Sequence, residues 1–196
     1  MCINGQIDHT IFIHPVTSGN LGGLSGADAT CQAAADGASL DGTFKAILSD
    51  SNEDARDRIR FKGPVYNTNG GEMVIPANQA ILFDSDFMLY NSFEYIAAGT
   101  MAAEFNDLEY AYTGTDEDGY GDGADCGNWT LTSGSATRAD SSSTNPGVWL
   151  DDGNTIACDS NTHIICIGGQ MDHTMFVFDA ANGNLGGLSG ADSSCQ

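Results

Sequence analysis

The sequence predicts an α+β fold of two short helices, short antiparallel strands and long loops, stapled by disulfide bonds and repeated in tandem. Three observations lead to this prediction. A segment of 31 residues occurs twice, two helix-like segments precede a series of short strand-like ones, and six cysteines stand in a chain rich in Asp, Gly, Ser and Thr. Separate runs of helices and strands are typical of α+β proteins, and a fixed sequence period is typical of repeat proteins.

The internal repeat defines the unit. Residues 2–32 read CINGQIDHTIFIHPVTSGNLGGLSGADATCQ, and residues 166–196 read CIGGQMDHTMFVFDAANGNLGGLSGADSSCQ. Twenty of the 31 positions are identical without a gap, at an offset of 164 residues. We therefore expect residues 1–7 to end one unit and connect it to the next, residues 8–167 to form a complete unit, and residues 168–196 to connect to and begin another. On this interpretation the chain starts inside a repeat.

The first half of the unit carries both helices. Thr10–Ile13 is a β-branched, apolar run typical of a strand. A helix capped at Ser25 should follow and end at Gly37. Thr43–Leu48 alternates as a strand does, and a cap within residues 49–52 should open a second helix, Glu53–Arg60.

The second half reads as short strands between Gly-rich and Asn-rich loops. We expect strands at Glu72–Ile75, Ala80–Phe83, Glu109–Thr113, Asn128–Leu131, Gly147–Leu150 and His163–Ile167. Trp129 and Trp149 should belong to the hydrophobic core.

The charge of the chain excludes several classes of partner. Six Lys and Arg against 27 Asp and Glu give a formal net charge of −21. Nucleic acid binding requires a basic face, so we expect no nucleic acid partner. No apolar run approaches the roughly 20 residues of a membrane-spanning helix. The cysteines indicate an oxidising compartment, and we expect a secreted protein outside the cell or at its surface.

Four of the six cysteines lie within one repeat period, and two lie outside it. One period holds Cys31, Cys126, Cys158 and Cys166, and four cysteines allow three pairings that spacing does not distinguish. We expect Cys2 and Cys195 to bond to neighbouring repeats or chains. The alternative is local pairing of Cys2 with Cys31 and of Cys166 with Cys195.

Several phrases resemble a bacterial secreted family of C-type-lectin-like domains of unknown function, found in leptospiral endostatin-like proteins. They are GNLGGLSGAD, TFKAILSD, YTGT and CGNWT, and the similarity covers about residues 8–167. The resemblance implies Cys31–Cys166 and Cys126–Cys158 disulfides and adjacent first and last strands. It implies no activity, because this fold serves sugar binding, protein binding and scaffolding.

One acidic loop predicts a cation site. In residues 115–125, TDEDGYGDGAD, carboxylates alternate with glycines, which suits a hard cation such as Ca²⁺. The candidate ligands are Asp116, Asp118, Asp122 and Asp125. The alternative is a solvated acidic loop tethered by Cys126. The sugar-binding tripeptides of calcium-dependent lectins, Glu-Pro-Asn and Gln-Pro-Asp, do not occur.

No catalytic site is predicted, and we do not expect an enzyme. Ser25 in Gly-Leu-Ser-Gly is better explained as a helix cap than as a nucleophile, because the final Gly of an esterase elbow and a His/Asp partner pattern are missing. His9 and His173 occupy one repeat position and are expected at a strand edge.

The function predicted from these observations is structural: a subunit of an extracellular filament, stalk or sheath made of tandem units. The alternative is a surface adhesin that binds a host or matrix protein or a glycan. Six residues, 168–173, would join consecutive units, so neighbours should touch. The junction should be formed by Gln6, Asp8, His9, Gly168, Gly169, Gln170, Asp172 and His173.

Overall fold

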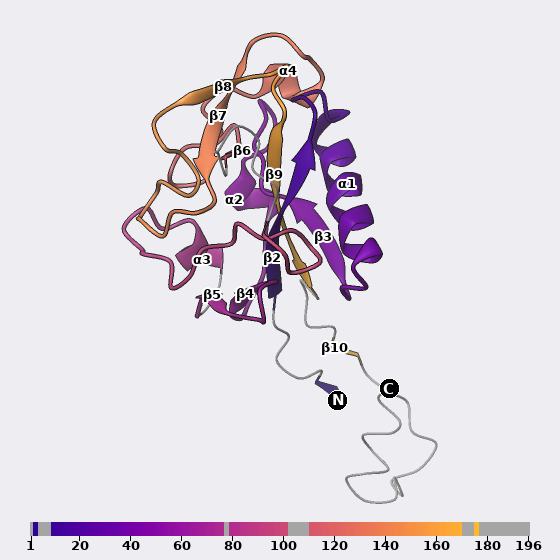
Figure 1. Cartoon of the computed structure of the whole chain (residues 1–196). Coiled ribbons are helices and arrows are strands. Elements are labelled where there is room, and N and C mark those ends of the chain that lie inside the picture. The colour runs from indigo at the N-terminus through magenta and orange to yellow at the C-terminus, as the bar shows by residue number, and fades with distance from the viewer. Residues whose placement is uncertain (1, 4–8, 77–78, 102–109, 170–174, 177–196) are drawn as a thin grey trace, which may run out of the picture.

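The computed structural model describes residues 2–3, 9–76, 79–101, 110–169 and 175–176 (Figure 1). Its helices are α1 (Gly23–Gly37), α2 (Ala55–Arg58), α3 (Gln79–Leu82) and α4 (Cys126–Trp129). Its strands are β1 (Cys2–Ile3), β2 (His9–Val16), β3 (Thr43–Ala46), β4 (Val65–Asn67), β5 (Met73–Ile75), β6 (Tyr110–Tyr112), β7 (Ser135–Asp140), β8 (Thr155–Ala157), β9 (Thr162–Gly169) and β10 (Met175–Phe176). The fold is therefore α+β.

The central strand of the unit is β9. The mixed eight-stranded sheet has the order β5-β4-β2-β9-β6-β7-β8, and β3 also pairs with β9. Along one edge β9 is antiparallel to β2, from Thr10 opposite Gly168 to Val16 opposite Thr162. The other edge pairs with β6 near the start of β9 and with β3 at its end. Every residue of β9 is buried, so the last strand of the unit completes its core.

The sheet is covered on both faces because its inner strands are apolar on both sides. Ile11, Ile13, Ile165 and Ile167 face one cluster of buried residues, while Phe12, Ile164 and Cys166 face another. This alternation is the period of two expected of a strand. In Figure 1, α1 lies along one side of the sheet, and α2 and α3 pack on the other.

Helix α1 presents small residues to the sheet. Ala27, Cys31 and Ala35 recur every four residues and are buried. The helix starts at Gly23, two residues before the expected cap at Ser25, which is exposed. The capping residue is Gly22, in a left-handed conformation (φ 79°) that glycine adopts at no steric cost, and no side chain caps this end.

Three expected strands are wrong. Ala80–Phe83 falls in helix α3, and Gly147–Leu150 is a turn. Asn128–Leu131 overlaps α4, a tight turn in which Cys126, Gly127, Asn128 and Trp129 all have positive φ. A strand is impossible there because the Asp125 carboxylate accepts the Asn128 backbone N–H at 3.0 Å and closes the turn. Both tryptophans are buried as expected, and the Trp129 indole N–H donates to the Ser49 carbonyl at 2.7 Å.

Within the described residues, no helix combines the length and the apolar character needed to cross a membrane.

Candidate functional site

Both ends of the unit lie at one end of the sheet. Thr10, next to the start of β2, pairs with Gly168, next to the end of β9. The chain therefore enters and leaves the unit through neighbouring strands, as Figure 1 shows at the lower ends of β2 and β9. Adjacent first and last strands are what the family resemblance implies.

Three of the proposed junction residues belong to the sheet of the unit itself. His9 is 1% exposed, its ring lies 4.9 Å from that of Phe61, and its Nε2 lies 3.2 Å from the Lys62 carbonyl oxygen. Gly168 packs against β3, and a Cβ atom there would lie 2.4 Å from the Phe44 ring. Gly169 is opposite Thr43 of β3, and a Cβ on Gly42, the residue before β3, would lie 2.5 Å from the Gly169 carbonyl carbon.

His9, Gly168 and Gly169 therefore pack within the unit, at the end where the chain enters and leaves it, and their place at a junction between units stays a prediction. The sheet also reaches two residues beyond the expected boundary at Ile167, because β9 needs Gly168 and Gly169 to pair with β3. The other proposed junction residues lie outside the described residues. They are Gln6, Asp8, Gln170, Asp172 and His173.

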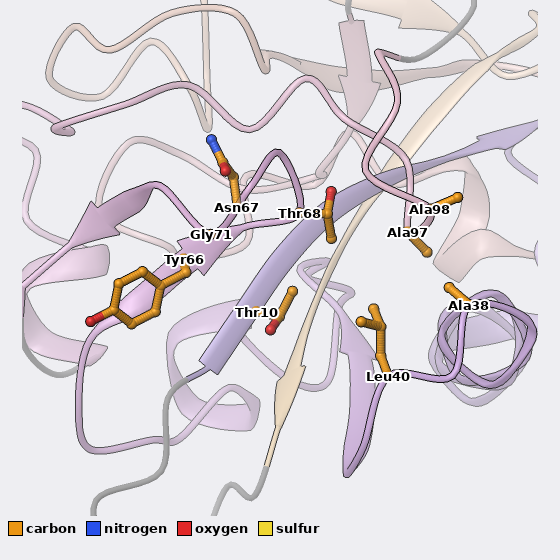
Figure 2. A pocket seen from close by; sticks show the side chains of 9 residues that line it. All are labelled: Thr10, Ala38, Leu40, Tyr66, Asn67, Thr68, Gly71, Ala97 and Ala98. Atoms are coloured by element: carbon orange, nitrogen blue, oxygen red, sulfur yellow. The ribbon is translucent and has the colours of Figure 1, made fainter.

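A pocket of about 590 Å³ opens beside this end of the unit. Thr10 of β2, Tyr66 and Asn67 of β4, Leu40 after α1 and Ala98 contribute to its lining, and Figure 2 shows these side chains around the start of β2. None of its lining residues is charged. The Asn67 amide donates to the Ser92 carbonyl at 2.9 Å, so this polar group is committed to the fold. The lining of the pocket is therefore neutral.

The acidic loop is held by its own carboxylates. One Asp116 oxygen accepts the backbone N–H groups of Asp118 and Tyr120, at 3.1 and 2.8 Å. Asp122 accepts the Ala124 N–H at 3.0 Å and the Thr137 hydroxyl. Asp125, which is buried, closes the turn at Asn128. Among the described residues, no group of three or more His, Cys, Asp or Glu side chains is arranged to hold a metal ion.

Oxygens of Asp116, Asp122 and Asp125 thus accept hydrogen bonds within the protein, and the calcium site predicted at Asp116, Asp118, Asp122 and Asp125 stays a prediction. Acidic groups nevertheless gather next to the loop. Burial raises the pKa of Asp151, and the nearby charges of Asp122, Asp152 and Asp116 raise it further, while a hydrogen bond from the Gly153 N–H opposes the rise.

Two disulfides join the layers of the unit. Cys31 of α1 bonds to Cys166 of β9, and Cys126 bonds to Cys158, the residue that follows β8. These are the pairs that the family resemblance implies. Cys195 lies outside the described residues, as does the side chain of Cys2, so their predicted bonds to neighbouring repeats stay predictions.

The ends of the chain repeat the pairing of the unit. Strand β1 is antiparallel to β10, with Cys2 opposite Phe176 and Ile3 opposite Met175. In the complete unit, Cys166 is opposite Phe12 and Ile167 opposite Ile11. Each residue of the short pair thus stands 164 positions from its counterpart in the long pair, which is the period of the sequence repeat.

Residues 14–145 match a family described as protein of unknown function (DUF1554). The chain belongs to the DUF1554 family. The region of similarity to DUF1554 begins within β2, continues through α1 and the acidic loop, and ends after β7. The comparison with curated proteins gave no match.

Sequence reasoning missed the pocket of this DUF1554 chain. Its lining comes from four separate segments, of which the pairing of β2 with β4 brings two together. One local signal was available: Asn69-Gly70 lies between β4 and β5, and Asn-Gly is a strong indicator of a β-hairpin.

Proposed function

We propose that this chain is part of an extracellular structural protein, a filament, stalk or sheath in which disulfide-bonded units of 164 residues follow one another in tandem. One observation carries the proposal. The pair β1–β10 has the register of β2–β9 shifted by one repeat period. Strand β1 thus repeats the last strand of the unit and β10 repeats its first strand, and both keep the pairing register, which supports a continuing array.

We also propose that the unit has the C-type-lectin-like fold. Three features support this assignment: the pairing of the first strand with the last, the disulfide from α1 to the last strand, and a second disulfide among the loops. The two disulfides also support a location outside the cell, because disulfides persist in oxidising compartments. The proposal involves no enzymatic activity and no cofactor.

The experiment is electron microscopy of the native full-length protein, together with recombinant chains of two to eight consecutive units. We expect stiff particles whose length increases regularly with the number of units. Separate domains joined flexibly in every preparation, with the disulfides intact, would contradict a structural array. A surface adhesin for a host protein, matrix protein or glycan would then be the better hypothesis.

A further inference from the structure

Consecutive units of a tandem array can stack end to end only if the chain enters at one end of a unit and leaves at the other. This unit does not have that arrangement. Its first and last strands are neighbours, with Thr10 opposite Gly168, so the chain enters and leaves at the same end. We call this end of the unit its base.

The link between consecutive bases is short. Strand β9 ends at Gly169, and His173 is the repeat equivalent of His9, the first residue of β2. Residues 170–172 are all that separates the two positions. Even a fully extended chain of this length spans no more than about 14 Å. The base of each unit must therefore lie next to the base of the unit that follows.

The spacing of the bases is smaller than the width of a unit. Neighbouring strands in a sheet lie about 5 Å apart. Together with the connector, the line of bases advances by no more than about 20 Å per unit. A compact domain of this size has a radius of gyration of about 15 Å and is about 40 Å across. Successive units therefore cannot stand in a row on one side of that line.

We infer that the units project alternately from a common spine of connectors and contact one another through their bases. This inference rests on the proposed tandem array and specifies its geometry and its contact surface. The contact surface is the pocket lined by Thr10, Leu40, Tyr66, Thr68 and Ala98, and its occupant is the base of the adjacent unit.

Charge supports this choice of surface. Residues 9–172 carry 24 Asp and Glu against six Lys and Arg, so two copies of the unit repel each other over most approaches. The lining of the pocket carries no charged residue, and it lies beside the strand at which the connector arrives. The base thus offers the short-range contact that a crowded junction requires.

The first test measures growth with length. Chains of four, six and eight units, each repeating residues 9–172, are compared by small-angle scattering and electron microscopy. We expect the longest dimension to increase by about 20 Å or less per added unit. Stiff particles that lengthen by about 40 Å per unit would overturn the spine while leaving the proposed filament intact. Flexible particles without regular growth would contradict both.

The second test measures protection of the base. Tyr66 is half-buried in the unit and lines the pocket, whereas Tyr120 is 47% exposed and does not line it. Hydroxyl-radical footprinting should modify Tyr66 at least threefold more slowly in the four-unit chain than in a single unit, with Tyr120 unchanged. Equal rates for Tyr66 in the two chains would overturn the contact surface.

A matched pair of variants checks the same surface. Ala98→Glu places a negative charge on the exposed edge of the pocket, and Ala157→Glu places one on exposed β8. We expect Ala98→Glu to restore the single-unit rate at Tyr66 in the four-unit chain and Ala157→Glu to leave the protection in place. Unchanged protection in both variants would overturn the assignment.

Discussion

Arg58 and Asp28 form a largely buried ion pair that joins α2 to α1. The Arg58 Nη2–Asp28 Oδ2 distance is 2.7 Å, and the side chains are 4% and 25% exposed. Both also bind the backbone of Ala46 at the end of β3, where Arg58 donates to its carbonyl oxygen and Asp28 accepts its N–H. Two helices and a strand therefore depend on one pair of side chains.

We predict that Asp28→Ala lowers the free energy of unfolding by about 3 kcal/mol, because the buried guanidinium keeps only the exposed Glu53 carboxylate, 3.6 Å away. The control is Asp57→Ala, which removes the exposed partner of Arg60 and should cost less than about 0.5 kcal/mol. Chemical denaturation of both variants measures the difference. Equal small losses would show that water replaces the carboxylate beside Arg58.

The acidic loop shows that residue type alone does not decide how a carboxylate is used. Its composition indicated a cation site, but carboxylate oxygens are also good acceptors for backbone N–H groups of tight turns. Asp116 accepts two such groups and Asp125 a third. Which use a carboxylate serves depends on turn geometry, and spacing in the sequence does not specify that geometry.

At the scale of elements, the predictions that succeeded are those for segments whose apolar residues recur with a clear helical or strand period. The strand around Thr10–Ile13, the helix ending at Gly37 and the strand at His163–Ile167 have clear apolar periods, and all three are confirmed. Ala80–Phe83 is a short apolar run, and such a run fits a strand or a helix equally well. Strand β7, Ser135–Asp140, was missed because it is mostly polar and owes its conformation to its neighbours β6 and β8.

The contact between β3 and β9 yields a second prediction. Gly168→Ala should destabilise the unit by about 2 kcal/mol or more, because its Cβ would meet both the Phe44 ring and the Thr43 carbonyl oxygen, 2.5 Å away. Gly37→Ala, at the end of α1, is the control. A Cβ there meets nothing within 4 Å, so its effect should be neutral or slightly stabilising. Thermal unfolding of the two variants distinguishes a packing requirement from a general sensitivity to loss of glycine.

For the whole molecule, the two disulfides should differ in their contribution to stability. Cys31–Cys166 spans 135 residues and Cys126–Cys158 spans 32. In the chain-entropy description, these loops correspond to about 5 and about 3.7 kcal/mol. We therefore predict that Cys31→Ala/Cys166→Ala lowers the free energy of unfolding by about 1 kcal/mol more than Cys126→Ala/Cys158→Ala. A larger loss in the second variant would show that the loops, rather than the closure of the sheet, limit stability.

The central position of β9 also affects how the protein is made. Because synthesis proceeds from the N-terminus, the sheet stays open until the last strand leaves the ribosome. The second copy of the β2 sequence follows at once, after residues 170–172. Antiparallel pairing of β9 with that copy closes a three-residue hairpin, whereas pairing with β2 closes a loop of 145 residues, 17–161.

Loop closure favours the local hairpin by about 3 kcal/mol, and hairpins form within microseconds. In the proposed array, β2 of each nascent unit would thus compete for β9 with the first strand of the unit translated next. A Cys31–Cys166 bond holds β9 in its own unit, where it pairs with β2. A premature Cys166–Cys195 bond would instead hold β9 to the segment translated after it. In the proposed array, thiol–disulfide exchange would be the step that replaces such a wrong bond with the native one.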